Sequence, residues 1–234
     1  MIEKERHDII LSLLKNREYI TYAELFQKIN LSESTIRRDV DKMNKLGIIN
    51  KIKGGIENIE KLKYDISFNQ RISEHNKEKK KICENAKKYI KNGDLIYLDA
   101  GSTTYELIEY LRDKDICVVT NGLMHIEKLL SYNINTVIIC GKIKMSTKAI
   151  VGNECLSFLD RYIFDVAFLG VNGISETYGL TTPDIQEGLI KEKVITQSKK
   201  TIVLADSSKL NKVSNIKFGN YDDVLIITEN GEIK

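Results

Sequence analysis

The sequence predicts two domains of different fold class. Residues 1–57 are expected to form an α+β domain of winged helix-turn-helix type, residues 58–75 a linker, and residues 76–234 an α/β domain with a mainly parallel sheet. Short segments with helical spacing fill the first fifty residues, and strand-like runs alternate with helical ones from Asp94 onward. Such alternation is typical of a parallel sheet with helices on both faces.

The positive charge is concentrated in the first part of the chain. Residues 1–91 contain 21 lysines and arginines against 14 aspartates and glutamates, a net charge of +7, and the remaining residues have a net charge of −4. A basic segment of this kind is typical of a protein that binds a polyanion. A solvated, lysine-rich surface would have the same composition, so composition leaves both readings open.

The composition is that of an ordinary globular protein rather than a disordered or fibrous one. Of the 234 residues, 42% are hydrophobic, 29% are charged and one, Pro183, is proline. No apolar run is long enough to span a bilayer, and the first ten residues are charged where a signal peptide needs apolar residues. We therefore expect a cytoplasmic protein without a membrane partner.

The cysteines form no recognisable motif. They are far apart in the sequence, and no C-x-x-C pair or cluster of histidine and cysteine accompanies them. Metal ligation needs such spacing, whereas buried reduced thiols do not. We expect reduced thiols in the core, no bound metal and no cofactor. The four residues are Cys83, Cys117, Cys140 and Cys155.

The first domain is expected to begin with two short helices. Residues 3–16 place four apolar residues on one helical face, namely Ile9, Ile10, Leu13 and Leu14. Thr21 then stands at an N-cap position with Glu24 three residues later, a capping-box pattern that starts a second helix.

A third helix is expected between Ser32, which caps it, and Gly47, with Ile36, Val40 and Met43 on its buried stripe. The short turn before it gives the form of a helix-turn-helix, in which the first residues of the second helix of the pair enter the major groove. Any amphipathic three-helix unit would show similar spacing. The residues expected to reach the groove are Ser32, Glu33, Ser34, Thr35 and Arg38.

Three basic residues are expected to contact the DNA backbone rather than bases. Arg37 either reaches a phosphate or pairs with Asp41 one turn later, and the sequence leaves both open. After Gly47, the sequence IINKIKGGIEN predicts two short strands around a turn, which form a basic wing. Lys51 and Lys53 of this wing are expected to contact phosphates.

The amino-acid sequence of the first domain resembles that of the winged N-terminal domain of DeoR-type repressors, which are bacterial regulators of sugar metabolism. The stretches ERHDIILSLL and SESTIRRDVDKMNKLGIINKIKGGI carry the resemblance. The family's usual wing has Arg and His where this chain has Asn50 and Lys53, so the likeness is closer in the reading helix than in the wing. The resemblance implies double-stranded operator DNA as a partner.

A lysine-rich helix is expected to follow the linker. Its buried face is predicted to contain Ile82, Ala86, Tyr89 and Ile90. We expect its run KEKKK, residues 77–81, to be a solvated helix surface rather than a second contact with DNA. The family resemblance extends to this region through the preceding SFNQR.

Six strands and three helices are expected in the second domain. The strand-like segments are residues 94–100, 115–122, 135–141, 165–174, 200–208 and 222–229. The helical segments are residues 103–111, 124–132 and 185–200. Polar residues and glycines follow five of the strands, at residues 99–104, 120–122, 141–142, 170–173 and 206–209. Because ligands bind outside the carboxyl ends of the strands in such sheets, we expect a binding site there.

The turn at residues 99–104 has the residues of a phosphate site. Gly101 lets the backbone approach an anion, and Ser102, Thr103 and Thr104 offer hydroxyl and N–H donors at the positive end of a helix. An ordinary helix cap by Ser102 or Thr103 would explain the same residues equally well. Lys209 is either a second cation for the same phosphate or an exposed loop lysine.

The second domain resembles the effector domain of the same DeoR-type family, so the resemblance covers nearly the whole chain. It rests on LDAGSTT, VVTNGL, LADSSKL and residues 151–195. That domain is related to ribose-5-phosphate isomerases and binds phosphorylated sugars. The resemblance implies that the Ser102–Thr104 turn and Lys209 hold a phosphate. It implies that the sugar faces Asp99, Asn121, Asn172, Asp184, Glu187 and Lys191.

The sequence leaves two alternative functions open, an isomerase and a DNA-binding protein that senses no ligand. Isomerising a sugar phosphate needs a general base, and the isomerases have an acidic Asp-Gly-Ala-Asp-Glu pattern where this chain has residues 169–173, LGVNG. The amide of Asn172 can bind a hydroxyl group but cannot take a proton, although Glu187 and Glu192 lie nearby in sequence. No catalytic residue is therefore expected. The second alternative is a DNA-binding protein whose second domain only oligomerises.

The sequence and the resemblance together predict a transcriptional repressor that a phosphorylated sugar releases from its operator. A single winged domain covers little DNA, so a homo-oligomer, either a dimer or a tetramer, is expected.

Overall fold

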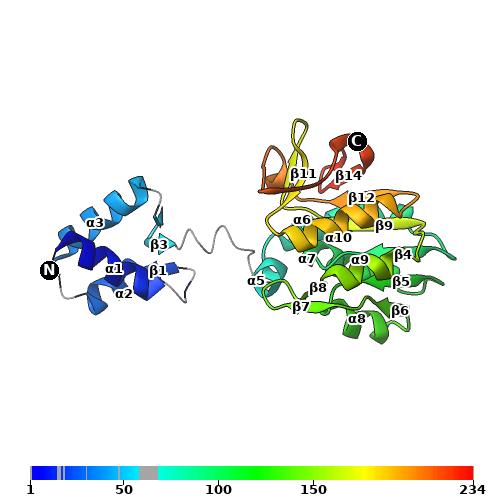
Figure 1. Ribbon diagram of the computed structural model, residues 1–234, viewed down its shortest axis with the longest axis horizontal. Helices are drawn as coiled ribbons and strands as arrows, with labels where there is room; N and C mark the ends of the chain where they lie inside the picture. Colours follow the sequence, from blue (N-terminus) through cyan, green and yellow to red (C-terminus); the bar gives the residue numbers. More distant parts are fainter. Residues whose placement is uncertain are drawn as a thin grey trace. The chain divides into compact units, whose positions relative to one another are not determined.

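The computed structural model describes residues 2–14, 17, 19–29, 31–46, 48–57 and 68–233. The chain divides into two compact units, Met1–Asp65 and Ile66–Lys234. Figure 1 shows the elements of both units. The hydrophobic core clusters of the two units are separate. The predicted fold class, a winged helix-turn-helix followed by an α/β domain with a mainly parallel sheet, is confirmed.

The described residues of the first unit form three helices and a three-stranded antiparallel sheet. The helices are α1 (Glu3–Leu14), α2 (Tyr22–Lys28) and α3 (Glu33–Lys45). The strands, in the order they pair, are β1 (Tyr19–Thr21), β3 (Gly55–Glu57) and β2 (Asn50–Ile52). The three helices and the two strands of the wing were predicted, and β1 was not. Gly47, the predicted end of the third helix, lies outside the described residues.

Local hydrogen bonds fix where α2 and α3 begin. The Thr21 hydroxyl accepts from the Glu24 N–H at 3.3 Å, and the Glu24 carboxylate accepts from the Thr21 N–H at 3.0 Å, which completes the predicted capping box. The Ser32 hydroxyl accepts from the Thr35 N–H at 3.3 Å. Both predicted N-caps are therefore confirmed.

The two glycines of the wing have different structural roles. Gly54 has a φ of +96°, a conformation that glycine adopts without strain, and it makes the turn between β2 and β3. A Cβ atom on Gly55 would lie 2.3 Å from the Ile20 carbonyl oxygen. Gly55 is therefore required for β1 to pair closely with β3.

A buried ion pair joins α1 to α3. The Arg6 guanidinium donates to both carboxylate oxygens of Asp39, at 2.6 and 2.9 Å, and Asp39 is almost completely buried. Because Arg6 hydrogen-bonds it, the pKa of Asp39 is lowered. The remaining core beneath the reading helix is apolar and includes the predicted Ile36, Val40 and Met43.

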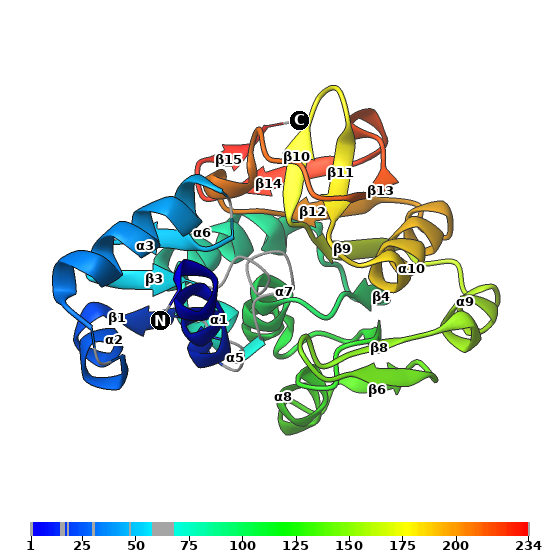
Figure 2. The same ribbon diagram turned by 60° about the vertical axis from the view of Figure 1, so that its left-hand side comes forward.

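The second unit is built on a seven-stranded sheet with helices on both faces (Figures 1 and 2). Its order is β15 (Gly231–Glu232), β14 (Leu225–Thr228), β12 (Thr201–Leu204), β9 (Val166–Gly170), β4 (Leu95–Leu98), β5 (Cys117–Thr120) and β6 (Asn135–Ile138). All neighbours are parallel except β15, which is antiparallel to β14. The six parallel strands are the six that the sequence predicts.

Two hydrophobic cores lie on opposite faces of this sheet. One contains α6 (Asn76–Ala86), α7 (Ser102–Leu107) and α8 (His125–Ser131), and the other contains α9 (Asn153–Leu159) and α10 (Ile185–Thr196). Successive residues of β4 divide between them, since Ile96 and Leu98 belong to the first core and Tyr97 to the second. Short 3₁₀ segments complete the helical elements: Lys87–Tyr89, Ile108–Leu111, Ser207–Lys209 and Tyr221–Asp223.

Several elements of the second unit were not predicted. Helix α9 is one, and the β7–β8 hairpin is another, formed by β7 (Lys142–Lys144) and β8 (Ala149–Val151). A small antiparallel sheet is the third, in the order β10 (Gly173–Ser175), β11 (Gly179–Thr182) and β13 (Ile216–Gly219). All these strands have three or four residues.

The predicted linker, residues 58–75, lies partly outside the described residues, which resume at Phe68. Residues 68–75 belong to the second unit. Helix α5 (Phe68–Ser73) packs on α7, and the Phe68 N–H donates to the Ser146 carbonyl at 3.0 Å. The second unit therefore begins with a short helix that the sequence interpretation assigned to the linker.

The four cysteines are all free thiols, but their environments differ. Cys83 and Cys155 are buried, as expected, whereas Cys117 is half-buried and Cys140 is exposed. In the described part of the chain, no helix combines the length and apolar character needed to span a membrane.

Candidate functional site

The order of the parallel strands reverses between β4 and β9. Strands β5 and β6 extend the sheet on one side of β4, and β9, β12 and β14 extend it on the other. In open α/β sheets, the crevice outside the carboxyl ends of the strands at such a reversal is where ligands bind. The end of β4 is Leu98, so the turn that begins at Asp99 lies at this crevice.

A pocket lies at this point of the sheet. It brings together nine of the eleven residues predicted to bind an effector: Asp99, Gly101, Ser102, Thr103, Asn121, Asn172, Glu187, Lys191 and Lys209. Thr104 and Asp184 are the two that do not line it. Four of the five polar strand ends contribute residues, but Gly141 and Lys142 do not, because β6 is the edge strand farthest from the reversal on its side.

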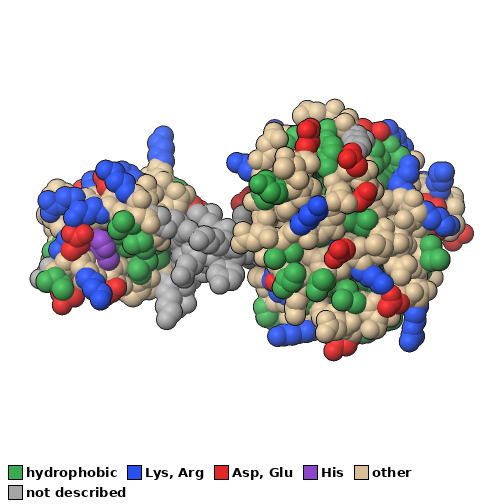
Figure 3. Space-filling view, turned by 45° about the horizontal axis from the view of Figure 1, so that its top comes forward, with side chains coloured by type: hydrophobic (Ala, Val, Ile, Leu, Met, Phe, Trp, Pro, Cys, Tyr) green, Lys and Arg blue, Asp and Glu red, His purple; other side chains and the backbone are tan. Residues whose placement is uncertain are grey.

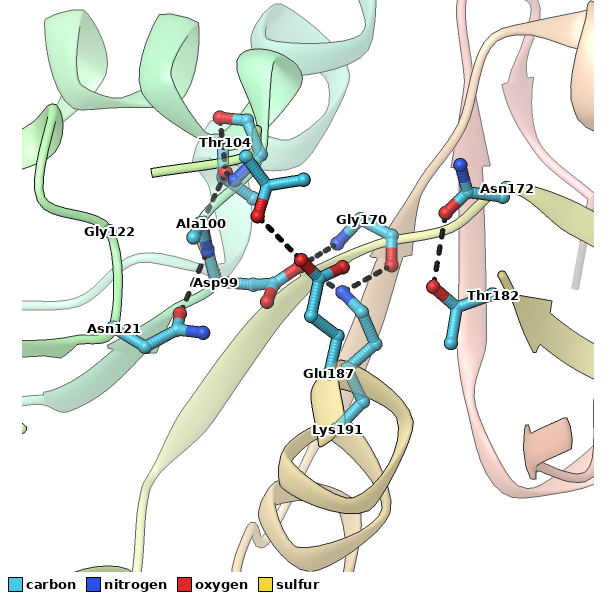
Figure 4. A network of polar contacts seen from close by, with 12 residues as sticks. Asp99, Ala100, Thr104, Asn121, Gly122, Gly170, Asn172, Thr182, Glu187 and Lys191 are labelled. Carbon is cyan, nitrogen blue, oxygen red and sulfur yellow. Dashed lines mark hydrogen bonds and ion pairs between the residues drawn. The ribbon is translucent and has the colours of Figure 1, made fainter. Parts of the chain in front are cut away.

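Asp99 and Lys191 form a buried ion pair at the centre of the pocket (Figure 4). Asp99 also accepts from the Gly170 N–H at 3.0 Å, and the Lys191 ammonium donates to the Gly170 carbonyl at 3.0 Å. The side chains of Asp99 and Lys191 are only 5% and 6% exposed. The pair therefore links β4, β9 and α10 at the reversal, and its two charges neutralise one another.

Asn121 and Thr104 hold the turn after β4 in place. The Asn121 side-chain oxygen accepts from the Ala100 N–H at 2.8 Å (Figure 4). The Thr104 hydroxyl accepts from the Gly101 N–H at 2.9 Å and contacts the Asp99 and Gly101 carbonyls. Thr104 is fully buried, so its hydroxyl shapes the turn and does not face the pocket as the sequence interpretation expected.

The helix that follows this turn is shorter than predicted. α7 has six residues and continues as a 3₁₀ segment. A long helix would have supplied a dipole at the turn, whereas here the donors are the individual N–H and hydroxyl groups of Ser102 and Thr103. These two residues line the pocket, and Ser102 is buried.

Asp184 and Glu187 connect α10 to the β7–β8 hairpin. Asp184 caps α10 by accepting from the Gln186 and Glu187 N–H groups at 2.9 and 3.0 Å, and it does not line the pocket, so its contact with a sugar stays a prediction. Glu187 does line the pocket, where it accepts from the Thr147 hydroxyl at 2.6 Å and from Lys144 at 3.2 Å. One turn separates it from Lys191 on the same helix (Figure 4).

The other predicted residues lie at the rim. Asn172 accepts from the Thr182 hydroxyl at 3.2 Å (Figure 4). Lys209 is half-buried, with its ammonium 4.0 Å from Asp206, which itself caps the following 3₁₀ segment by accepting from the Ser208 N–H.

Two basic residues that the sequence interpretation did not assign to the pocket also line it. Arg71 lies on α5 and Lys79 on α6. Lys79 is 4% exposed, so the expectation that the run at residues 77–81 is entirely solvated is wrong at this position. A signal was present, because Lys79 falls on the same helical stripe as Ile82, Cys83 and Ala86.

The guanidinium of Arg71 has donor atoms that its surroundings do not satisfy. Its Nε and Nη2 atoms are buried, and neither has a hydrogen-bond partner among the described residues. Lys79 donates to the Arg71 carbonyl, and burial lowers the pKa of Lys79. Buried donors of this kind are normally satisfied, so an anion in the pocket would complete them.

The reading helix of the first unit is capped and exposed as predicted. Ser32 caps α3, and its hydroxyl lies 3.1 and 2.8 Å from the hydroxyls of Ser34 and Thr35. Glu33 and Arg38 are exposed. The first turn of α3 therefore presents the hydroxyl groups, the carboxylate and the guanidinium that the sequence analysis expected to reach DNA bases, and their contact with bases stays a prediction.

Arg37 has a different environment from the one expected. Its ion-pair partner is Glu33 at 3.8 Å, not Asp41, and its guanidinium lies over the Tyr22 ring at 4.5 Å. Asp41 instead accepts from the Lys51 ammonium at 2.6 Å. The side chains of Arg37 and Lys51 are both about half exposed. Because exposed ion pairs are weak, each side chain can exchange its carboxylate partner for a DNA phosphate.

The wing adds exposed basic charge beside α3. Lys53 is exposed in the turn between β2 and β3, next to the half-exposed Lys51. On the face of the first unit shown in Figure 3, lysine and arginine side chains lie close together, whereas on the second unit basic and acidic side chains are interspersed. The exposed basic residues Arg37, Arg38, Lys51 and Lys53 therefore lie on the reading helix and on the wing beside it.

The two units together define a class of protein. A helix-turn-helix with a basic wing binds DNA, and an α/β unit with a polar pocket at its strand reversal binds a small ligand. Their presence in one chain is the organisation of a ligand-sensing transcriptional regulator.

Comparison with known families identifies the family. Residues 6–61 match the DeoR-like helix-turn-helix domain, and residues 74–230 match the DeoR C terminal sensor domain. The chain therefore belongs to the DeoR family of helix-turn-helix transcriptional regulators, and the resemblance seen in the sequence is confirmed.

Individual relatives match this chain over nearly their whole length. The chain is 39% identical to the transcriptional regulator FruR of Bacillus subtilis, over 99% of this chain and 93% of the relative. It is 31% identical to the transcriptional repressor GlcR of Bacillus subtilis, over 98% and 89%. It is 26% identical to the lactose phosphotransferase system repressor of Staphylococcus epidermidis, over 100% and 95%.

Solved structures are similar to this chain at low sequence identity. The translation initiation factor eIF-2B of Pyrococcus horikoshii matches with a TM-score of 0.51 and 17% identity, over 68% of this chain and 64% of that chain. Ribose 5-phosphate isomerase A of Methanocaldococcus jannaschii matches with a TM-score of 0.42 and 24% identity, over 56% and 53%. The chain thus spans about half the length of the isomerase.

Proposed function

We propose that this regulator is a repressor of a sugar-utilisation operon and that a phosphorylated sugar in the pocket releases it from operator DNA. The observation that carries the proposal is the Arg71 guanidinium, whose Nε and Nη2 atoms are buried without a partner among the described residues. It lines the same pocket as Ser102, Thr103 and Lys79. These groups are donors, and a phosphate offers several acceptor oxygens with the opposite charge.

The sugar portion of the effector would meet a different set of groups. Asn172, Glu187 and the Asp99–Lys191 pair line the pocket and offer both donors and acceptors for hydroxyl groups. The names of the relatives support repression and a link to sugars, since one is the repressor GlcR and another is a lactose phosphotransferase system repressor.

A melting experiment tests the proposal. A ligand present at one hundred times its dissociation constant adds about 2.7 kcal/mol to the stability of the folded state, which raises the melting temperature of a unit of this size by roughly 5–10 °C. A panel of sugar phosphates and the matching free sugars should contain phosphates that stabilise the protein, and the same compounds should weaken its affinity for operator DNA at fixed salt. A panel without any stabilising phosphate would contradict the proposal.

Two variants connect this result to the pocket. Arg71→Gln and Lys79→Gln each remove a charged donor, so the stabilising phosphate should bind roughly 10- to 100-fold more weakly. Lys81→Gln is the matched control, because Lys81 is exposed in the same lysine-rich run. It should bind like the unmodified protein. Equal losses in all three variants would indicate a general effect of charge instead of a site.

We further propose that the protein acts as a homodimer or tetramer, is located in the cytoplasm with the chromosome, and does not catalyse sugar isomerisation. Single winged domains cover too little DNA for high specificity, which supports an oligomer. The relatives are transcriptional regulators, which supports a binding role for the pocket. Incubating the protein with the stabilising sugar phosphate and analysing the products would reveal any isomerisation.

A further inference from the structure

Two aromatic rings of α2 lie against the guanidinium of Arg37. Tyr22 and Phe26 are one turn apart on α2, with ring centroids 5.8 Å apart and ring planes inclined by 25°. The Arg37 Cζ atom, on α3, lies 4.5 Å from the centroid of the Tyr22 ring and 5.3 Å from that of Phe26. Both distances are within the range of a cation–π interaction. We call Tyr22 and Phe26 the aromatic pair.

The aromatic pair is part of the packed core of the first unit. Tyr22 is 8% exposed, and the half-buried Phe26 packs against the same core. The Tyr22 N–H donates to the Gly54 carbonyl at 2.9 Å, which connects the start of α2 to the turn of the wing. The rings are therefore fixed by their neighbours, whereas the Arg37 side chain is about half exposed.

The hydroxyl of Tyr22 does not explain why a tyrosine lies at this position. Its oxygen is buried and has no hydrogen-bond partner among the described residues. A buried hydroxyl without a partner is unfavourable, so the unit gains from the ring and not from the hydroxyl. Phenylalanine would keep the ring and remove this unsatisfied group.

The contacts of Arg37 with the described residues leave its N–H groups available. Its guanidinium lies 3.8 Å from the Glu33 carboxylate, which is too long for a hydrogen bond. The aromatic rings attract its positive charge. A guanidinium has five N–H donors in a planar fork that suits a phosphate. The side chain is therefore restrained by the rings while its donors can still bind an anion.

A second cation lies close to Arg37. The hydrogen bond from Lys51, on β2, to Asp41 raises the pKa of Lys51, and the charge of Arg37 acts in the opposite direction. The two cations are therefore close enough to repel one another. An anion that contacts both would relieve this repulsion. A DNA phosphate is the anion that a reading helix and its wing meet.

We propose that Tyr22 and Phe26 are positioning residues for DNA binding: they hold the Arg37 guanidinium so that its donors meet a backbone phosphate of the duplex. An arginine side chain loses rotamer freedom when it binds, and a side chain that is restrained in advance loses less. The aromatic pair would therefore increase the affinity for DNA without contacting DNA itself. The proposal concerns the DNA-binding unit alone and does not depend on the effector.

A double-mutant cycle in the full-length protein tests this role. The probe is a DNA duplex of arbitrary sequence, because phosphate contacts supply nearly all of non-specific binding. Arg37→Gln should weaken binding about 10-fold and reduce the slope of log K against log salt concentration by about 0.9 per DNA-binding unit. Tyr22→Leu should weaken binding about 3- to 10-fold when Arg37 is present, but less than about twofold in the Arg37→Gln background.

Tyr22→Phe is the matched control, because it keeps the ring and should bind DNA like the wild type. Equal losses from Tyr22→Leu with and without Arg37 would overturn the proposal, since the ring would then act through the stability of the unit. Tyr22→Phe that binds as weakly as Tyr22→Leu would also overturn it, because the hydroxyl would then be the group that matters. An unchanged salt slope in Arg37→Gln would have the same consequence.

Two further measurements keep the proposal testable if Tyr22→Leu does not fold. Phe26→Leu changes a half-buried ring and should weaken binding in the same Arg37-dependent way. In NMR spectra of the unmodified protein, the ring current should shift the Arg37 Nε–H resonance upfield, and the shift should persist when the duplex is bound. Loss of that shift on binding would overturn the proposal. A wild-type protein that binds no DNA at all would contradict the proposed function as well, which separates the two failures.

Discussion

The charged residues of the pocket differ in how many of their hydrogen-bonding groups are free to contact a ligand. Asp99 and Lys191 satisfy one another and the Gly170 peptide, so an anion gains little from them. Arg71 has two buried donor atoms without a described partner, and this is the group that an anion would satisfy. The specificity for a phosphate is therefore expected to come from α5 and α6 as much as from the turn after β4.

His125 should give the second unit a specific pH dependence. Burial lowers its pKa from 6.5 to about 4, so between these values the unfolded chain binds a proton that the folded protein excludes. Its neutral form therefore contributes stability that is lost as the pH falls from about 6.5 to about 4, with a loss of about 2 kcal/mol between pH 7 and pH 5.

Urea denaturation of the wild type and of His125→Gln at pH 7 and pH 5 checks this prediction. Both proteins lose stability through their carboxylates, and only the wild type should show the additional loss. The same pH dependence in the two proteins would show that His125 titrates normally in the folded state.

The residues that the sequence could identify are those with a strong local signal. Gly101, Ser102 and Thr103 follow a strand and precede a helix, and that pattern predicts their place in the pocket. Asp184 and Thr104 have the right residue types, but their side chains are used by a helix cap and a turn. Nothing local distinguishes a hydroxyl that caps a turn from one that faces a ligand, because the difference depends on which way the side chain points.

At the scale of elements, the capping box of α2 is a feature whose contribution can be measured. Thr21→Val keeps the shape of the side chain but removes the oxygen that accepts from the Glu24 N–H, so the first unit should lose about 1 kcal/mol of stability. The unfolding transition of the first unit in urea measures this loss of stability. Thr21→Ser is the control, because it keeps the hydroxyl. If Thr21→Ser lost as much stability as Thr21→Val, the effect would come from packing rather than from the hydrogen bond.

The parallel strands were predictable, and the other strands, except the two of the wing, were not. The six parallel strands are runs of mainly apolar residues, and all except the edge strand β6 are mostly buried. Such runs are recognisable without knowledge of their partners. β1, β7, β8, β10, β11 and β13 have three or four residues each, and their hydrogen-bonded partners lie elsewhere in the chain. Their pairing is decided by the tertiary structure, as the close approach of β1 to Gly55 illustrates.

Helix α6 shows how a charge pattern can mislead. A run of four lysines and one glutamate indicates a solvated surface, and most of this run is exposed. Lys79 is the exception because its position on the helix places it on the buried stripe. A helical wheel contains this information, but the usual assumption that lysine faces water overrides it.

At the scale of the whole molecule, the two units should be separable by substitution. Arg38→Ala should weaken specific operator binding roughly 10-fold or more and leave effector binding unchanged, because Arg38 is exposed on the reading helix. Thr103→Val combined with Lys209→Ala should weaken effector binding by a similar factor and leave operator binding without effector unchanged. Operator titrations and melting curves with the effector measure both properties. A variant that alters both would contradict the assignment of one role to each unit.

The position of Arg71 in the chain has a mechanical consequence. Arg71 belongs to α5, the first described element after the first unit, so a ligand bound by Arg71 would contact the part of the second unit that is nearest in sequence to the DNA-binding unit. The shortest covalent path from the ligand to the reading helix therefore starts at a ligand-binding residue and contains no strand of the seven-stranded sheet. An effector held by Arg71 would therefore be linked to the DNA-binding unit by a path that does not pass through the sheet.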